Sequence, residues 1–114
     1  MTLTGHPLLP VAWSVLERAI QQRRRVRLGY NGRDRLVCPH ALGWKNGRVV
    51  ALVYQCDGMT SEGPIATSPR QRWRSLFLDD IEHAGMASGV WQSANNYSLD
   101  TILMDTVVVA VNPK

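Results

Sequence analysis

The residues best suited to chemistry in this 114-residue chain are its arginines, and they gather in one region. Residues 18–48 include nine basic side chains and one acid, Asp34, whereas residues 75–113 have five acids and no Lys or Arg. Eleven of the thirteen basic residues are Arg, whose planar guanidinium can donate two parallel hydrogen bonds to one phosphate. This asymmetry predicts a basic face that attracts a phosphate-bearing partner, and the alternative is a set of merely solvated charges.

The candidate ligand-binding residues combine guanidinium groups with aromatic and amide side chains. Phosphates favour forked cationic donors, and nucleobases favour an aromatic face. Tyr30 or Trp73 would supply that face, although core packing is the alternative role of both rings. Gln55 would either read the edge of a base or cap the sheet. The guanidinium groups expected to meet the phosphate are those of Arg25, Arg27, Arg35, Arg48 and Arg74.

The sequence lacks the spacings typical of enzymes and of metal sites. Four titratable side chains occur in the run Asp-Asp-Ile-Glu-His at residues 79–83, but neither a strand nor a helix would put three of them on one face. Cys38 and Cys56 form no Cys-x-x-Cys motif and are expected to be buried, reduced thiols. There is no Gly-x-Ser-x-Gly motif and no glycine-rich phosphate loop. We expect a protein that is not an enzyme and that holds no metal and no cofactor.

The composition is typical of one globular domain. The chain is 45% hydrophobic and 19% charged, with a mean hydropathy of -0.16, so a single domain over residues 1–114 is expected. Its longest strongly apolar run, residues 49–54, is far shorter than the roughly 20 residues that span a bilayer. Residues 1–7 lack the basic start of a secretory leader. These features predict a cytoplasmic protein without membrane contact, and they exclude the fibrous and disulfide-rich secreted classes.

A single helix is expected ahead of the strands that would position the arginines. Apolar residues recur every three to four positions over residues 10–22, which predicts an amphipathic helix with Pro10 in its first turn. The run Arg-Arg-Arg at residues 23–25 follows the end of that helix, where cations meet the negative end of the helix dipole. That position gives the run a structural reason that needs no ligand.

Two β-hairpins are predicted from Asn-Gly turns. The first turn, at residues 31–32, joins strands at residues 25–30 and 33–40, the former alternating apolar and polar side chains. The second Asn-Gly turn leads into residues 49–56, which are apolar on both faces. A strand of that kind is typical of the centre of a sheet.

The register of the first hairpin decides which arginines share a face. A two-residue turn would set Leu28 opposite Arg35, which mixes core and surface side chains. A three-residue loop sets Leu28 opposite Leu36, so that the apolar side chains coincide. We favour the three-residue loop, which would place Arg25, Arg27 and Arg35 on one face.

The rest of the chain predicts two more strands, at residues 72–78 and 102–111, the latter interrupted by an aspartate. Residues 57–71 are rich in Gly, Ser, Thr and Pro, and a stretch of that length suggests a functional lid or a disordered loop. Residues 86–99 have no regular pattern. One helix followed by consecutive strands predicts a mainly β (α+β) fold, with a small twisted sheet or barrel and an N-terminal helix.

Four segments, in this order, resemble a WYL domain. They are RRRVRLGY at residues 23–30, RLVCPHALG at 35–43, GRVVALVYQ at 47–55 and WRSLFLDDI at 73–81. The resemblance implies an SH3/Sm-like β-barrel over about residues 25–83, with the helix before it and the strand at about 102–111 as an extension. It implies a ligand sensor of bacterial transcription regulators and phage-defence proteins, with nucleotides or single-stranded oligonucleotides as ligands. His40 would then line the ligand pocket, and the alternative is a half-buried histidine bound by backbone.

The chain also departs from that family's pattern. Val-Ala-Leu stands at residues 50–52 in place of Trp-Tyr-Leu. The terminal element at residues 76–81 lacks both family arginines, although Arg74 lies just upstream of it. The single helix before the barrel leaves no room for a helix-turn-helix, so a regulator would need a separate DNA-binding partner. Two functions follow as hypotheses. One is a module that binds a nucleotide or short single-stranded nucleic acid, and the other is a protein-interaction module that docks through an edge strand or residues 107–109 onto a second copy or an acidic partner.

Overall fold

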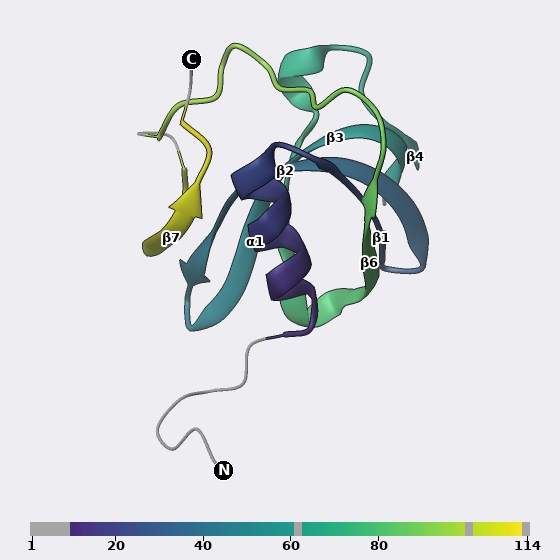
Figure 1. The fold of residues 1–114 in the computed structure, drawn as a ribbon. Coiled ribbons are helices and arrows are strands. Elements are labelled where there is room, and N and C mark those ends of the chain that lie inside the picture. The colour runs from purple at the N-terminus through teal and green to yellow at the C-terminus, as the bar shows by residue number, and fades with distance from the viewer. Residues whose placement is uncertain (1–9, 61–62, 100–101, 113–114) are drawn as a thin grey trace.

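The computed structural model describes residues 10–60, 63–99 and 102–112, and it has a mainly β fold with one α-helix in that part of the chain (Figure 1). The leader expectation for residues 1–7 lies outside the described residues. No helix in the described part is long and apolar enough to cross a bilayer. The elements in chain order are α1 (Ala12–Gln22), β1 (Arg25–Tyr30), β2 (Arg33–Lys45), β3 (Arg48–Thr60), β4 (Gly63–Pro64), the 3-10 turn η1 (Pro69–Gln71), β5 (Trp73–Phe77), the 3-10 turn η2 (Leu78–Asp80), β6 (Ile81–Ala87) and β7 (Thr106–Ala110).

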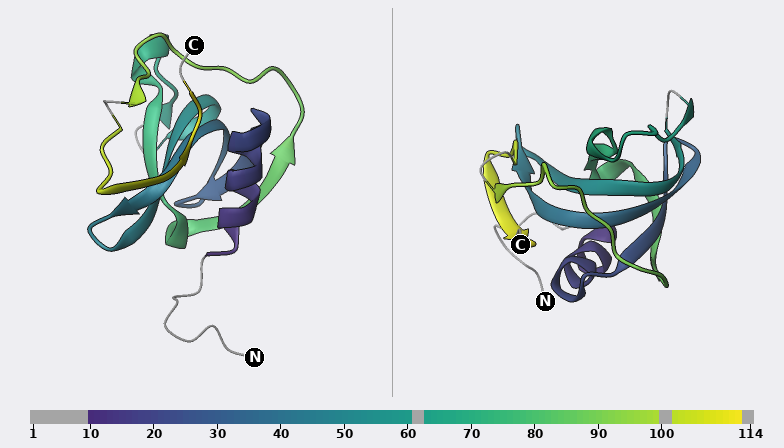
Figure 2. Two further views of the ribbon diagram at one scale, coloured as in Figure 1. Left: turned by 60° about the vertical axis from the view of Figure 1, so that its left-hand side comes forward. Right: turned by 90° about the horizontal axis from the view of Figure 1, so that it is seen from above.

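Helix α1 confirms the amphipathic pattern. Its apolar face, which includes Trp13, Leu16 and Ile20, is buried, whereas Arg18 and Gln21 are exposed. The helix ends at Arg23, which adopts a left-handed conformation with φ of 52°. This ending turns the chain directly into β1, so that the helix packs within the curve of the strands (Figure 2).

The first hairpin has the two-residue turn, so the favoured three-residue register is wrong. Asn31 and Gly32 both have positive φ, 54° and 74°, as the two-residue turn with right-handed strand twist requires. Leu28 therefore pairs with Arg35. The pairing does not mix core and surface side chains, because Arg35 is itself buried, with 3% of its surface exposed. Arg27 pairs with Leu36 on the opposite face, so Arg35 does not share a face with Arg27.

Strands β2 and β3 form the second predicted hairpin, with its turn at Asn46 and Gly47. β3 is an interior strand with partners on both edges, but the middle strand of the sheet is β2 and not β3 as expected. β3 pairs with β2 along most of its length, and its other edge pairs with β4 and β5. The ladder between β2 and β3 shifts register twice, and each shift leaves one residue outside the pairing. Those residues are His40 in β2 and Cys56 in β3.

The strands pair antiparallel in the order β4-β3-β2-β1-β6, with β5 on β3 and β7 on β2. Strand β6 was not expected from the sequence. Its small residues Ala84 and Gly85 leave no clear alternation of apolar and polar side chains. The sheet curves strongly around the core but is not closed, since β5 and β6 do not pair with each other. Its inner face buries apolar side chains of α1, β1, β2, β3 and β5 in one cluster.

Residues 57–71 do not form one long loop in the part that the structure describes. β3 continues to Thr60, β4 follows at Gly63–Pro64, and η1 ends the segment at Pro69–Gln71. Residues 88–99, by contrast, contain no strand, as the irregular pattern predicted. This irregular segment crosses the outer face of the sheet, where it contributes to the site described next.

Candidate ligand-binding site

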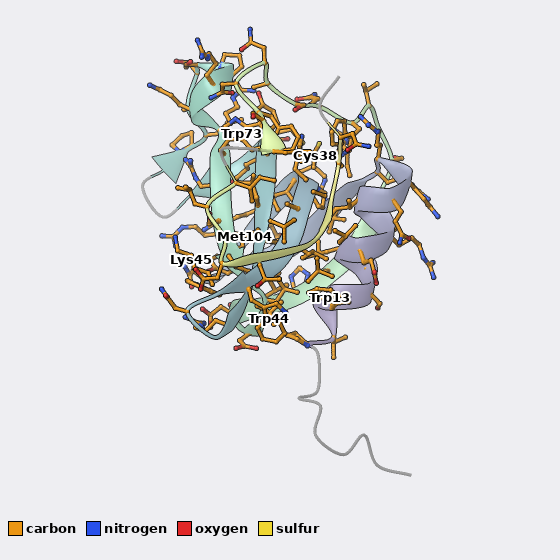
Figure 3. The ribbon with its side chains drawn as sticks, turned by 90° about the vertical axis from the view of Figure 1, so that its left-hand side faces the viewer. Trp13, Cys38, Trp44, Lys45, Trp73 and Met104 are labelled. Carbon is orange, nitrogen blue, oxygen red and sulfur yellow. The ribbon has the colours of Figure 1, made fainter. Side chains whose placement is uncertain are left out.

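A groove of about 420 Å³ lies on the outer face of β3 and β5, the face turned away from α1. Its floor is set by the pairing of Leu52 with Ser75, and its other wall comes from the chain after β6. Figure 3 shows Trp73 and Met104 on this side of the molecule, with α1 on the other. The lining residues are Leu52, Trp73, Arg74, Ser75, Asn96, Tyr97, Ile102, Leu103 and Met104. The volume falls in the range typical of small-molecule sites, about 300–1,000 Å³.

Two stacked aromatic rings form one wall of the groove. The centroids of Trp73 and Tyr97 are 5.5 Å apart and their planes differ by 22°. Trp73 Nε1 donates a hydrogen bond of 2.9 Å to Asn96 Oδ1, and the Tyr97 hydroxyl donates one of 2.6 Å to the carbonyl of Val111. Because the polar atom of each ring is bonded to protein, the rings are held in fixed positions. A flat apolar group such as a nucleobase can pack against surfaces of this kind.

Arg74 lines the groove between Trp73 and Ser75, but its pairing with Val53 starts its side chain on the opposite face of β5, the side of Arg35. Its Nη1 donates to two backbone carbonyls, those of Gln71 and Trp73, at 3.2 and 2.8 Å. Within the described residues no carboxylate pairs with it, since the ion pairs there are those of Arg48 and His83. The guanidinium therefore keeps a charge that an anion can meet.

Arg35, Tyr30 and Gln55 occupy the inner side of the sheet. The Arg35 guanidinium carbon lies 5.1 Å from the centre of the Tyr30 ring, and no residue of the described chain accepts a hydrogen bond from its Nε. Burial lowers the pKa of Arg35, and the nearby charge of Arg74 lowers it further, against an opposing effect of Tyr30. Gln55 is buried, and its side-chain amide donates to the Asp57 carbonyl at 3.2 Å, as the capping interpretation expects.

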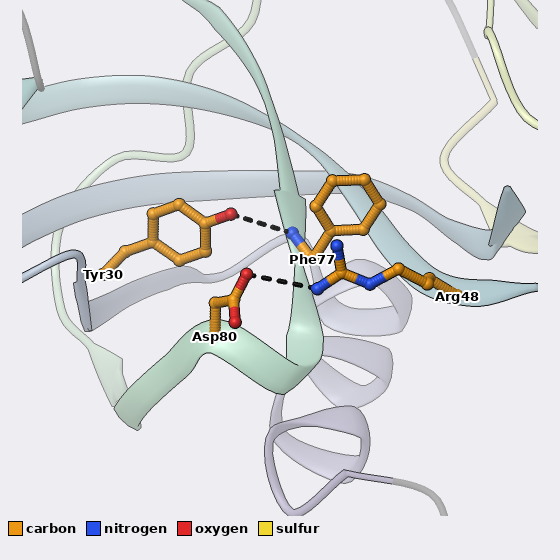
Figure 4. A network of polar contacts seen from close by, with 4 residues as sticks. All are labelled: Tyr30, Arg48, Phe77 and Asp80. Atoms are coloured by element: carbon orange, nitrogen blue, oxygen red, sulfur yellow. Dashed lines mark hydrogen bonds and ion pairs between the residues drawn. The ribbon is translucent and has the colours of Figure 1, made fainter. Parts of the chain in front are cut away.

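Arg48 does not line the groove. Its Nη2 lies 3.2 Å from Asp80 Oδ2, and its guanidinium lies 3.8 Å from the centre of the Phe77 ring (Figure 4). The neighbouring Tyr30 hydroxyl accepts a bond of 3.2 Å from the backbone N–H of Phe77. Arg48 thus forms an ion pair with Asp80 and a cation–π contact with Phe77, and these contacts connect β3 to the turn after β5.

Arg25 and Arg27 line a different, open hollow beside β6. Arg25 donates from Nε and Nη2 to the carbonyl of Ser88, at 3.1 and 2.7 Å, and from Nη1 to Cys56 Sγ at 4.0 Å. The structure therefore separates the predicted arginines into groups. Arg74 and Arg35 lie near each other, whereas Arg25, Arg27 and Arg48 lie elsewhere.

His40 is fully buried behind the aromatic wall rather than in the groove lining. Its ring stacks on Trp91 at 4.4 Å and meets Trp73 and Tyr97 edge-on at 4.6 and 4.8 Å. Nδ1 donates to the carbonyl of Cys38 at 2.7 Å, and Nε2 accepts from the Ser93 hydroxyl at 2.8 Å. Burial lowers the pKa of His40 to about 4, so the ring is neutral at pH 7. His40 packs against the rings that line the groove. Its bond to the Cys38 carbonyl agrees with the alternative interpretation, a histidine bound by backbone, rather than with a ligand contact.

The sequence analysis missed Tyr97, Asn96 and the apolar residues 102–104 of the groove. Asn96 and Tyr97 belong to a segment without a strand pattern, where single aromatic or amide residues give no periodic signal. Residues 102–104 were expected to begin the strand at 102–111, but that strand begins only at Thr106, which leaves them free to line the groove. The one usable sign was a tyrosine beside two asparagines in an otherwise irregular stretch.

Comparison of this chain with protein-family models, with curated proteins and with solved structures found no match. The WYL resemblance therefore stays an expectation, and the groove with its surrounding charges is the basis for function.

Proposed function

We propose that this chain is a non-enzymatic module that binds a nucleotide or a short single-stranded nucleic acid. The base would pack in the groove against Trp73 and Tyr97, and the phosphate would meet Arg74 at its edge. The observation that carries this proposal is the pairing of a fixed aromatic wall with a guanidinium that has no carboxylate partner in the described chain. Single-stranded nucleic acids are bound by this combination of stacking surfaces and positive charge.

Further arginines support the same site. Arg70 is exposed just before β5, and Arg72 is held by the carbonyls of Ala66 and Thr67, so three arginines alternate along one short segment. Arg35 adds a fourth positive charge close to Arg74, from the inner side of the sheet. A chain of phosphates that follows the start of β5 would meet these charges in turn.

The proposal includes the finer fold that the resemblance implies, an SH3/Sm-like barrel. Its support is the order of the elements: η2 leads from β5 into β6, and β6 returns to pair with β1. A role as a ligand sensor would require a separate chain that carries the output.

Replacing Arg74 provides the test. We expect Arg74→Gln to weaken the binding of a short oligothymidylate by roughly tenfold or more, because a hydrogen bond to a charged group contributes about 1.5–3 kcal/mol. Binding is measured by fluorescence anisotropy of the labelled oligonucleotide. Arg18→Gln is the matched control, since it removes the same charge from the exposed face of α1.

Two outcomes of the binding experiment would contradict the proposed site. Equal losses for both variants would show that only net charge matters, and undiminished binding by Arg74→Gln would remove the groove from the site. Ser75→Glu serves as a second variant, because Ser75 is exposed and lines the groove. The added carboxylate should repel the phosphate without disturbing the core.

Self-association is the second candidate, and β7 is the feature that favours it. Among the described residues β7 pairs with β2 alone, which leaves its outer edge open there, and its Val107 and Val108 are 43% and 51% exposed. Light scattering distinguishes the two functions, because the ligand groove does not involve β7 and needs no second copy.

A further inference from the structure

The two cysteines lie side by side on neighbouring strands. Cys38 of β2 and Cys56 of β3 are 18 residues apart in sequence, but their sulfur atoms are 3.8 Å apart and both are free thiols. Cys56 reaches this position because it is the residue left out of the ladder between the strands. The sequence analysis expected two buried thiols, whereas Cys38 is buried and Cys56 is partly exposed.

The surroundings of the two sulfurs differ. Cys56 receives the guanidinium of Arg25 at 4.0 Å from β1, and as a thiol it donates to the Leu36 carbonyl at 3.4 Å. Cys38 accepts the backbone N–H of Gln92 at 3.2 Å. The hydrogen bond from Cys38, and then the charge of Arg25, lower the pKa of Cys56 to about 7 against the effect of burial. The same hydrogen bond and burial raise the pKa of Cys38.

We propose that Cys56 and Cys38 form a redox-reactive site, in which the Cys56 thiolate is oxidised by a hydroperoxide and Cys38 then closes an intramolecular disulfide. The pair has the arrangement this chemistry needs: a partly exposed cysteine whose sulfur lies beside the Arg25 guanidinium, with a second thiol in contact with that sulfur. This site is separate from the proposed groove and does not depend on it.

The reaction proceeds in two balanced steps. The Cys56 sulfur attacks one peroxide oxygen and the O–O bond breaks, so that sulfur loses two electrons, the second oxygen leaves as hydroxide and takes up a proton, and Cys56 becomes a sulfenic acid. The Cys38 sulfur then attacks the Cys56 sulfur, the S–O bond breaks, and the hydroxyl leaves with the Cys38 proton as water. Two thiols and one hydrogen peroxide thus give one disulfide and two waters.

The geometry requires only a small approach of the two sulfurs. A disulfide bond is about 2.05 Å long, so the sulfurs must close from 3.8 Å across two strands that already pair. The lowered pKa of Cys56 leaves more of its thiol ionised at pH 7 than in an ordinary cysteine, which favours Cys56 over Cys38 as the sulfur that attacks the peroxide.

The experiment treats the whole folded chain with one equivalent of hydrogen peroxide at pH 7 and maps disulfides by mass spectrometry. We expect a monomer that is two hydrogens lighter, with Cys38 joined to Cys56, and recovery of both thiols with dithiothreitol. Cys38→Ala should stop at a sulfenic acid on Cys56 that dimedone traps. Cys56→Ala should give neither product, because Cys38 is buried and its thiol stays protonated.

The urea-unfolded chain is the control for the role of the fold. Loss of thiols at the same rate in folded and unfolded protein, or disulfides between chains instead of within one, would overturn the proposal. Arg25→Gln gives a further measurement, because loss of its charge should move the pH midpoint of Cys56 alkylation upward. An unchanged midpoint would show that Arg25 does not stabilise the thiolate.

Discussion

At the scale of single residues, burial affects His40 and Arg35 differently, although both were predicted from the sequence to bind a ligand. His40 avoids the cost by staying neutral, with both ring nitrogens bonded and three aromatic rings around it. Arg35 cannot lose its proton near neutral pH, so it stays charged at 3% exposure. A buried charge without a partner opposes folding, and a nearby aromatic ring offsets only part of that cost. Within the part of the chain that the structure describes, no carboxylate pairs with Arg35, so a ligand anion close to Arg35 and Arg74 would supply a partner.

His40 gives a prediction for acid stability. Its pKa in the folded chain is about 4, below the ordinary value of 6.5, so protonation favours the unfolded chain. The stabilisation is complete above about pH 6.5 and is lost as the pH falls towards 4. Between pH 7.5 and 4.5 the loss is on the order of 2–3 kcal/mol. Urea unfolding at the two pH values should show this loss in the natural chain and not in His40→Gln, and equal losses in both would contradict it.

At the scale of elements, irregularities in the β-ladder place the functional side chains. The register shifts in β2 and β3 release His40 towards the aromatic rings and Cys56 towards Arg25. In a ladder without register shifts, each of these residues would have a partner on the neighbouring strand, and its side chain would follow the regular alternation between the two faces. Close approach is also needed where β7 joins β2, at Gly43. There an added Cβ would meet the Thr106 carbonyl and its neighbours at less than 3 Å.

Gly43→Ala should therefore detach or displace β7. Overpacking of this kind costs about 1–3 kcal/mol, and the backbone contact with Thr106 cannot move aside as a flexible side chain would. Gly85→Ala in β6 is the matched control, because nothing lies within 4 Å of its added Cβ and its φ is not positive. Urea unfolding and hydrogen exchange of β7 amides compare the two variants. Equal stability of both would show that β7 does not pack as closely as described.

At the scale of the whole molecule, charge is unevenly distributed. The chain carries a net charge of +4, and the segment that enters β5 contains three arginines, of which Arg74 lines the groove. Arg48 and His83 are paired with acids in the described part, whereas Arg74 is not. The molecule thus keeps unneutralised charge where the proposed ligand would lie.

Salt dependence measures that charge. If three phosphates of an oligothymidylate are neutralised, the logarithm of the binding constant should fall against the logarithm of salt concentration with a slope of about −2. Arg74→Gln should reduce the steepness by roughly 0.7, the contribution of one phosphate on a single strand. The unphosphorylated nucleoside is the control and should show almost no slope. A flat dependence for the oligonucleotide would exclude phosphate recognition.

The sequence by itself determined the parts that depend on local forces. The helix follows from its 3.6-residue apolar period, and both turns follow from Asn-Gly pairs that accept positive φ. Only the tertiary structure decided which side chains meet. The register that separates Arg35 from Arg27 depends on whether Arg35 is buried, and the groove joins Trp73 to Tyr97 from a segment without a pattern. Contacts between distant segments depend on how the whole sheet curves and packs, which short-range spacing does not encode.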